Sequence, residues 1–274
     1  MDIANLMTEL TQATAALQIF AFFGVWLVLW LPIAIPLAIA LKWQPPQPLA
    51  ISQKLPLLAS LYLVAPLVLW GFATLAGASF AIYGLPWKPS VLISLAQGIG
   101  GGVLGLAILF GIEEKLGWVR WQPPSEDLVK TLISTLGLGI GVSLTEELIF
   151  RGFLFNQLQQ DYMPWIAAAI ASLIFALLHL VWEGKENIPQ LPGLWLMGMV
   201  LALARWVNGG ELGLAWGLHA GWIWAIATLD TAQLIAPTGK GAVWLTGFAG
   251  KPLAGVMGIL FLLGTGGALW LIGG

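Results

Sequence analysis

Long apolar stretches recur along the whole chain and constrain its fold more than any other feature. Hydrophobic residues make up 59% of the 274 residues and charged residues only 9%, whereas a soluble protein needs about a quarter of its residues charged. A stretch of about 20 apolar residues crosses the hydrocarbon core of a bilayer as a helix. The sequence therefore predicts an all-α polytopic helix bundle, integral to a plasma or internal membrane.

Eight stretches are long and apolar enough to be candidate spans. They cover about residues 17–41, 56–82, 90–112, 134–158, 164–182, 191–207, 211–229 and 252–272. Since these stretches fill most of the sequence, we expect a single integral membrane domain over residues 1–274, surrounded by membrane lipid. The net charge of −2 gives no sign of a nucleic-acid partner, and none is expected.

Basic residues are unevenly distributed over the predicted loops. The odd-numbered loops carry Lys42, Lys54, Lys115, Arg120, Lys130, Lys185, Lys240 and Lys251, while the even side carries Lys88, Arg151 and Arg205. Cytoplasmic loops of membrane proteins are enriched in lysine and arginine. We therefore expect the odd loops to be cytoplasmic and both termini to lie outside.

Two groups of glycines predict close helix packing. They are Gly98, Gly101, Gly102 and Gly105 in the third span and Gly213, Gly217 and Gly221 in the seventh. Glycines four positions apart form a flat stripe that lets two helix backbones approach closely. Many of the tryptophans, including Trp87 and Trp206, fall near span ends and are expected to anchor the protein at the membrane interface.

The fourth span differs from the others because Glu146, Glu147 and Arg151 put three charges within six residues of apolar sequence. Ionisable groups inside a membrane are costly and mark a candidate functional site. Glu147 and Arg151 are four positions apart and are expected to form a salt bridge on one helix face. Glu146 then points about 100° away without a local partner, which makes it a candidate general base. A structural ion pair between helices is the alternative interpretation.

Both histidines of the chain lie in apolar spans downstream of this segment. His179 follows Phe175 by one helical turn in the fifth span, and His219 lies within the glycine stripe of the seventh. At about 1.5 Å per residue, Glu146, His179 and His219 lie at depths of roughly 18, 22 and 12 Å from the same side. We expect them to share one cavity near the membrane midplane. By contrast, Glu113 and Glu114 adjoin Lys115 at a predicted loop and are expected to be solvated.

Three short motifs follow one another in order: Glu146-Glu147-xxx-Arg151, Phe175-xxx-His179, and His219 with Ile223 four positions later. They resemble the three motifs of the CPBP family, the CAAX proteases and bacteriocin-processing enzymes that include type II CAAX prenyl endopeptidases. The resemblance covers about residues 128–229, which we expect to be the catalytic core.

The resemblance implies an intramembrane glutamate endopeptidase that hydrolyses a membrane-associated or lipidated protein or peptide. Glu146 would activate a water molecule with help from His179, while His219 would stabilise the oxyanion. Glu147 and Arg151 would shape and support the site, next to Phe175 and Ile223.

One position departs from the pattern of the prenyl endopeptidases, which place asparagine four residues after the last histidine. Ile223 stands there in this chain, and isoleucine donates no hydrogen bond. One oxyanion donor, worth roughly 3–4 kcal/mol in other enzymes, is therefore absent or supplied from another position. The resemblance thus implies peptidase chemistry more firmly than it implies a prenylated substrate.

Other functions are compatible with the same residues. The sequence contains no cysteine, so thiolate metal sites and cysteine nucleophiles are excluded. No cofactor is expected, but one carboxylate and two imidazoles also form a ligand set for zinc with an open fourth position, as in a metallopeptidase. A non-catalytic scaffold or immunity-type binding protein, or a transporter with a buried proton relay, would use the same polar cavity.

Overall fold

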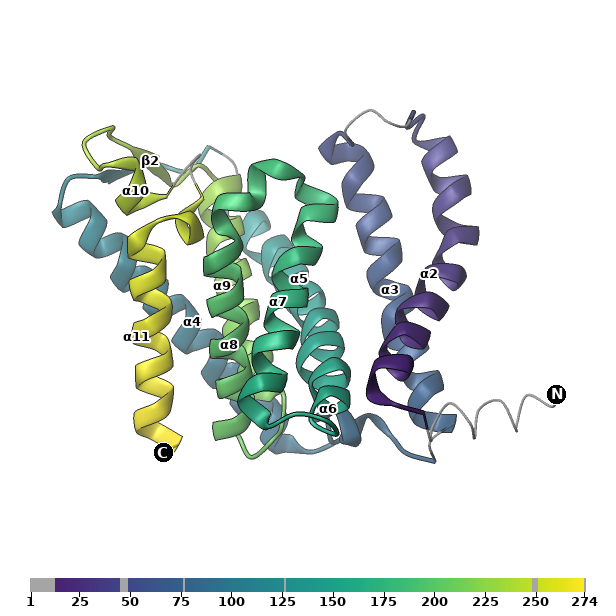
Figure 1. Cartoon of the computed structure of the whole chain (residues 1–274). Coiled ribbons are helices and arrows are strands. Elements are labelled where there is room, and N and C mark those ends of the chain that lie inside the picture. Colours follow the sequence, from purple (N-terminus) through teal and green to yellow (C-terminus); the bar gives the residue numbers. More distant parts are fainter. Residues whose placement is uncertain (1–12, 45–48, 76, 126, 248–250, 274) are drawn as a thin grey trace.

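The computed structural model describes residues 13–44, 49–75, 77–125, 127–247 and 251–273. Its long helices run side by side as a bundle (Figure 1). They are α2 (Ala15–Ala40), α3 (Ile51–Leu75), α4 (Pro89–Lys115), α5 (Leu128–Glu146) with its continuations η2 (Glu147–Leu154) and α6 (Phe155–Leu158), α7 (Pro164–Glu183), α8 (Leu191–Val207), α9 (Gly213–Thr231) and α11 (Val256–Gly273). The short elements are β1 (Val119–Trp121), β2 (Ile235–Pro237), α10 (Val243–Thr246) and the 3-10 turns η1 (Phe80–Tyr83), η3 (Lys185–Gln190) and η5 (Pro252–Ala254).

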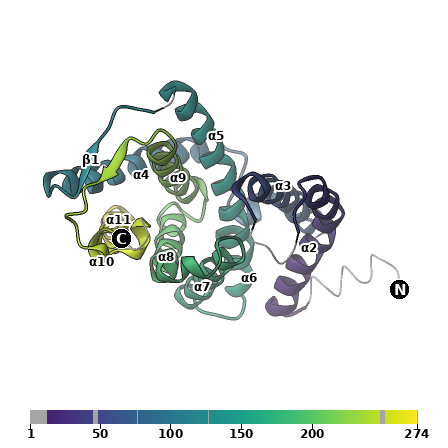
Figure 2. The ribbon, with the colours of Figure 1, turned by 90° about the horizontal axis from the view of Figure 1, so that it is seen from above.

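Seven helical segments in the described part of the chain are long and apolar enough to cross a membrane. The long helix that is not among them is α9, which contains His219, Asp230 and a stripe of glycines. Seen from above, α9 lies in the middle of the bundle between α4, α5 and α8 (Figure 2). A helix surrounded by protein rather than lipid needs no apolar outer face. The protein is therefore an integral, multi-pass membrane protein with an all-α bundle, and the predicted fold class is confirmed.

The second and fourth spans differ most from their predicted ends. α3 begins at Ile51 and ends at Leu75, because Gly77 takes a left-handed conformation with φ of 66° that breaks the helix. The fourth span begins at Leu128, six residues earlier than predicted. The carboxylate of Asp127 caps it by accepting hydrogen bonds from the backbone N–H groups of Val129 and Lys130.

The close helix packing predicted from the glycines is present, and the structure shows that the two groups pack against each other. A Cβ added to Gly98 would lie 2.5 Å from the carbonyl oxygen of Leu214, and one added to Gly217 would lie 2.2 Å from that of Leu95. Neither position has room for a larger side chain, so the backbones of α4 and α9 are in direct contact. Gly105 instead faces α11, where its Cβ would meet the ring of Phe261. The close α4–α9 contact fixes the position of α9 and hence of His219.

A short antiparallel ladder joins two loops at one end of the bundle. Val119 of β1 pairs with Pro237 of β2, and Trp121 pairs with Ile235. The ladder lies at the end of the bundle that also holds the loop between α2 and α3 (Figure 1). The odd loops of the sequence thus share one end, and their cytoplasmic placement stays a prediction.

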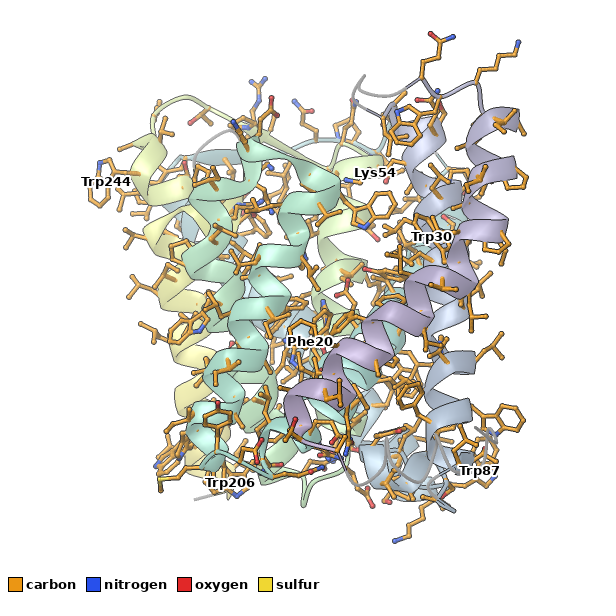
Figure 3. The ribbon with its side chains drawn as sticks, turned by 45° about the vertical axis from the view of Figure 1, so that its right-hand side comes forward. Phe20, Trp30, Lys54, Trp87, Trp206 and Trp244 are labelled. Carbon is orange, nitrogen blue, oxygen red and sulfur yellow. The ribbon has the colours of Figure 1, made fainter. Side chains whose placement is uncertain are left out.

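Aromatic side chains are found at both ends of the bundle. Trp87 and Trp206 lie at one end and Trp244 at the other (Figure 3), and all three are exposed. An indole ring with a polar N–H suits the boundary between lipid and water. The two ends of the bundle are thereby marked as interfacial zones.

The expectation that Glu113 is solvated was wrong. α4 continues to Lys115, so Glu113 lies on its last turn and is buried, while Glu114 is exposed. Glu113 is seven residues after Leu106 and four after Leu109, and all three occupy the helix face that packs into the bundle. The neighbouring charge of Lys115 could not show which face of the helix each glutamate occupies.

Candidate active site

Both glutamates of the predicted site lie where the fourth span changes its helical winding. α5 is α-helical as far as Glu146, and the next eight residues form the π-helical segment η2. Short π-helical segments are rare and occur frequently at functional sites. Every residue of η2 is buried, so its charged side chains have only protein groups as partners. The sequence pattern predicted an uninterrupted α-helix here and did not reveal this change.

The predicted ion pair between Glu147 and Arg151 is present, and it has a third member. Arg151 Nη1 lies 3.0 Å from Glu147 Oε1, and His219 Nδ1 lies 2.8 Å from the same oxygen. The guanidinium of Arg151 also lies over the ring of Phe175, 4.5 Å from its centroid. Because Glu147 and Arg151 are almost completely inaccessible, each charge depends on the other for its stabilisation.

Contact with Glu147 determines which nitrogen of His219 faces the rest of the site. A carboxylate only accepts hydrogen bonds, so the Nδ1–H of His219 donates to Glu147 Oε1. The other ring nitrogen, Nε2, lies 3.5 Å from Glu146 Oε2. His219 therefore stands between the two glutamates, with Nε2 directed to Glu146.

Glu146 has partners on two other helices. Its Oε2 faces His219 on α9, and its Oε1 accepts a hydrogen bond from the hydroxyl of Tyr62 on α3. The expectation that Glu146 has no partner on its own helix holds, because both contacts come from elsewhere in the chain. Three helices thus converge on one buried carboxylate.

His179 belongs to the same cluster but is not bonded to Glu146. Its Nδ1 lies 2.8 Å from the carbonyl oxygen of Phe175, which only accepts, so Nδ1 carries a hydrogen and the neutral ring has its lone pair on Nε2. The Phe175 ring contacts both histidine rings, with centroid distances of 4.7 Å to His179 and 6.1 Å to His219. Phe175 therefore separates and orients the two histidines.

Two residues of the cluster were missed in the sequence. Tyr62 lies near the middle of an apolar helix, where its hydroxyl finds no partner among lipid chains. Arg205 lies in the last turn of α8, donates to the backbone carbonyl of Arg151 and donates to Gly210 O at 2.9 Å. A polar group in mid-span is a signal for Tyr62, whereas Arg205 lies at a span end, where arginine is common, and neither lies in a recognisable motif. Ile223 lies one turn after His219 on α9 and is half-buried.

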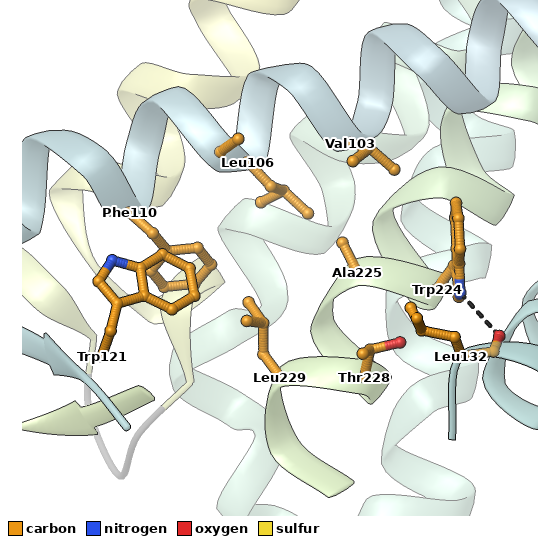
Figure 4. A pocket seen from close by; sticks show the side chains of 10 residues that line it. Val103, Leu106, Phe110, Trp121, Leu132, Trp224, Ala225, Thr228 and Leu229 are labelled. Carbon is orange, nitrogen blue, oxygen red and sulfur yellow. Dashed lines mark hydrogen bonds between the residues drawn. The ribbon is translucent and has the colours of Figure 1, made fainter. Parts of the chain in front are cut away.

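The residues of the cluster differ in how deeply they are buried. Glu146, Glu147, Arg151 and His219 are buried, whereas Tyr62 on α3 and His179 on α7 are half-buried. An apolar cavity of about 210 Å³ between α4, α5 and α9 lies elsewhere, and none of the predicted site residues lines it (Figure 4). The least buried members of the cluster, Tyr62 and His179, thus lie on α3 and α7.

The described residues include no group of three histidine, cysteine, aspartate or glutamate side chains arranged to hold a metal ion. The polar contacts found are instead hydrogen bonds and ion pairs among Glu146, Glu147, Arg151 and His219. The arrangement thus offers two carboxylates next to the imidazole of His219 within an apolar bundle. Such a set can take up a proton and donate hydrogen bonds to a developing negative charge.

Comparison with known proteins agrees with the motifs. A family model described as type II CAAX prenyl endopeptidase Rce1-like matches residues 128–237, less than half of the chain. No curated protein and no solved structure matches the chain. The matched segment contains Glu146, His179 and His219, together with the helices that carry them, and it lies in a membrane-spanning bundle. The chain is thus a multi-pass membrane protein whose residues 128–237 are similar to Rce1-like type II CAAX prenyl endopeptidases, and the family resemblance drawn from its motifs is confirmed.

Proposed function

We propose that the protein is an intramembrane endopeptidase that hydrolyses a peptide bond of a membrane-associated or lipidated protein or peptide. The observation that carries the proposal is the convergence of Glu146 and His219, 3.5 Å apart, in a buried cluster within the family segment. Peptide hydrolysis inside a membrane needs a base for the water and donors for the oxyanion. Both are available in this cluster.

Glu146 is the proposed general base. Its carboxylate takes a proton from a water molecule as the water oxygen bonds to the carbonyl carbon, and it later gives that proton to the leaving amine. His179 lies on the more accessible side of the site, and the lone pair on its Nε2 would help to hold the water. General-base assistance of this kind typically contributes about 10²–10⁴-fold to the rate.

His219 is the proposed stabiliser of the oxyanion. The bond from Nδ1 to Glu147 places any second ring proton on Nε2, where it faces the reacting groups. Glu147 holds the ring through this bond, and Arg151 prevents the burial of Glu147 as an unpaired charge. Glu147 and Arg151 thus act on the reaction through the orientation of His219.

The reaction proposed here needs no metal. A chelator distinguishes it from the zinc-dependent mechanism that the same residue types allow, because the chelator inhibits only the zinc-dependent enzyme. The proposed enzyme also differs from a binding scaffold or transporter, which would cleave nothing.

The test is a cleavage assay with purified protein in detergent or liposomes. Peptides with a C-terminal CAAX sequence would be offered with and without a prenyl group, alongside unmodified membrane-associated peptides, and products would be identified by mass spectrometry. We expect cleavage of at least one class, unchanged by a strong chelator. Chelator inhibition reversed by zinc would contradict the metal-free mechanism, and a lack of cleavage in all classes would contradict the endopeptidase proposal.

A further inference from the structure

Tyr62 links a helix outside the family segment to the proposed base. It lies in α3, more than sixty residues before residue 128, and its hydroxyl donates to Glu146 Oε1. A phenol in the hydrocarbon region finds no partner among lipid chains, so this contact satisfies its hydrogen-bonding group. The pairing joins two helices that are far apart in the sequence at the reacting carboxylate.

The position of Tyr62 is fixed by neighbouring hydrogen bonds between α2 and α3. Trp26 Nε1 donates to the carbonyl oxygen of Leu61 at 3.0 Å, and Trp30 Nε1 donates to Ser60 Oγ at 2.9 Å. These two indoles hold α2 against α3 at the residues directly before Tyr62. The hydroxyl therefore reaches Glu146 from a braced section of the helix.

The two carboxylate oxygens of Glu146 consequently have different partners. Oε1 is bonded to Tyr62, while Oε2 faces His219 Nε2 at a distance longer than a direct hydrogen bond. Holding one carboxylate oxygen orients the other, and orientation of the base is a requirement for efficient proton transfer. We therefore assign Oε2 as the oxygen that receives the proton from water.

The site also has few donors for an oxyanion. His179 Nδ1 and His219 Nδ1 are engaged by Phe175 O and Glu147, and Ile223 has no donor. Tyr62 is half-buried, whereas Glu146 and His219 are buried. Its hydroxyl is a neutral donor that can turn from Glu146 to a substrate.

We propose that Tyr62 is a catalytic residue with two successive contacts, an assignment that rests on the proposed peptidase function. While Glu146 is a carboxylate, the Tyr62 hydroxyl donates to Oε1 and orients the base. When Glu146 takes the proton from water, it loses its negative charge, and the carbonyl oxygen of the substrate gains one. The Tyr62 hydroxyl then donates to that oxygen, and Tyr62 keeps its own proton throughout. When the C–N bond breaks, Glu146 gives its proton to the amine.

The test is the Tyr62→Phe variant, which keeps the ring and removes only the hydroxyl. We expect kcat to fall about 10²-fold, the usual effect of removing one oxyanion donor, with little change in KM and with the protein still folded. A purely structural role would lower the amount of folded enzyme without lowering kcat per folded molecule. The same substitution in a Glu146→Gln background should cause no further loss, because both residues act in one step.

Tyr83→Phe is the matched control. Tyr83 is buried in η1, and burial raises the pKa of Tyr83 to about 12, so this substitution also removes a neutral hydroxyl. We expect it to retain wild-type kcat. Wild-type kcat in Tyr62→Phe would overturn the role of Tyr62 and leave the proposed function intact. A wild-type protein that cleaves no peptide would instead overturn the proposed function, and the role of Tyr62 with it.

Discussion

The α4–α9 pair and the α2–α3 hairpin are attached to the bundle by opposite kinds of surface. α4 and α9 meet through glycines, with no room for a side chain at Gly98 or Gly217. The hairpin meets the bundle through large aromatic rings, such as Phe22 against Phe153 with a centroid distance of 4.5 Å. Backbones in direct contact cannot shift without losing the interface, whereas rings can repack as two surfaces slide.

The two kinds of interface give the two sides of the site different mobility. α9 carries His219 and is fixed next to the Glu147–Arg151 pair, so the charged part of the site is rigid. The hairpin carries Tyr62, one of the less buried members of the cluster. The charged centre is therefore expected to be rigid and the wall that carries Tyr62 to be adaptable.

The largest effect is expected from Gly217→Leu. The first added carbon would lie 2.2 Å from the carbonyl oxygen of Leu95, so α4 and α9 must separate. Overpacking usually costs about 1–3 kcal/mol, and a clash with backbone should exceed that range and abolish folded protein. Gly100→Leu is the control, because a Cβ at Gly100 meets nothing within 4 Å. Equal yields of folded protein from both variants in size-exclusion chromatography would contradict the rigid interface.

A smaller but substantial effect is expected from Arg151→Ala. It leaves Glu147 as a buried charge without its partner, and such losses cost about 3–5 kcal/mol. The unfolding temperature, followed by tryptophan fluorescence, should fall clearly.

Lys251→Ala provides the comparison for Arg151→Ala. Lys251 lies 3.7 Å from Glu183 in a pair with side chains 26% and 35% exposed, and pairs of this kind contribute about 0.2–1 kcal/mol. The Lys251→Ala variant should therefore unfold near the wild-type temperature. If Arg151→Ala also kept the wild-type unfolding temperature but lost activity, Arg151 would act directly in catalysis instead.

The smallest effect is expected from Phe22→Leu, which weakens the attachment of the hairpin. Phe22 pairs with Phe23, Trp26 and Phe72 within the hairpin and with Phe153 outside it. Each ring pair is worth about 0.5–1.5 kcal/mol, and leucine replaces most of these contacts with other apolar ones. We expect a slightly lower unfolding temperature and a larger relative loss of kcat, because Tyr62 is less firmly placed. Phe20→Leu alters an exposed ring in the same helix and should change neither value. A loss of stability as large as that of Arg151→Ala would show that the hairpin is part of the rigid core.

Much of the fold could be predicted because the membrane imposes strong local rules. Hydropathy located the spans, and glycine spacing indicated which helix faces pack closely, although not that the faces of α4 and α9 meet each other. The depths of Glu146 and His219 in their spans predicted that the two residues would meet. All of these inferences use distances along single helices, which the sequence contains directly.

Other features depend on how separate helices meet and could not be predicted in this way. The π-helical η2 changes the winding of a segment whose residue types suit an α-helix equally well. Tyr62 and Arg205 reach the site from α3 and α8, and only the packing of those helices brings them there. The burial of Glu113 depends on which face of α4 turns inward near its end.

The proposed mechanism is tested most directly by Glu146→Gln, measured as kcat per folded molecule on a peptide that the wild type cleaves. Glutamine keeps the size and hydrogen bonding of the side chain but cannot take a proton from water. Glu114→Gln is the matched control, because Glu114 is exposed at the end of α4 and should retain full activity. The glutamate mechanism predicts a loss of at least about 10²-fold for Glu146→Gln with an unfolding temperature close to that of the wild type. Full activity of a folded Glu146→Gln protein would contradict it.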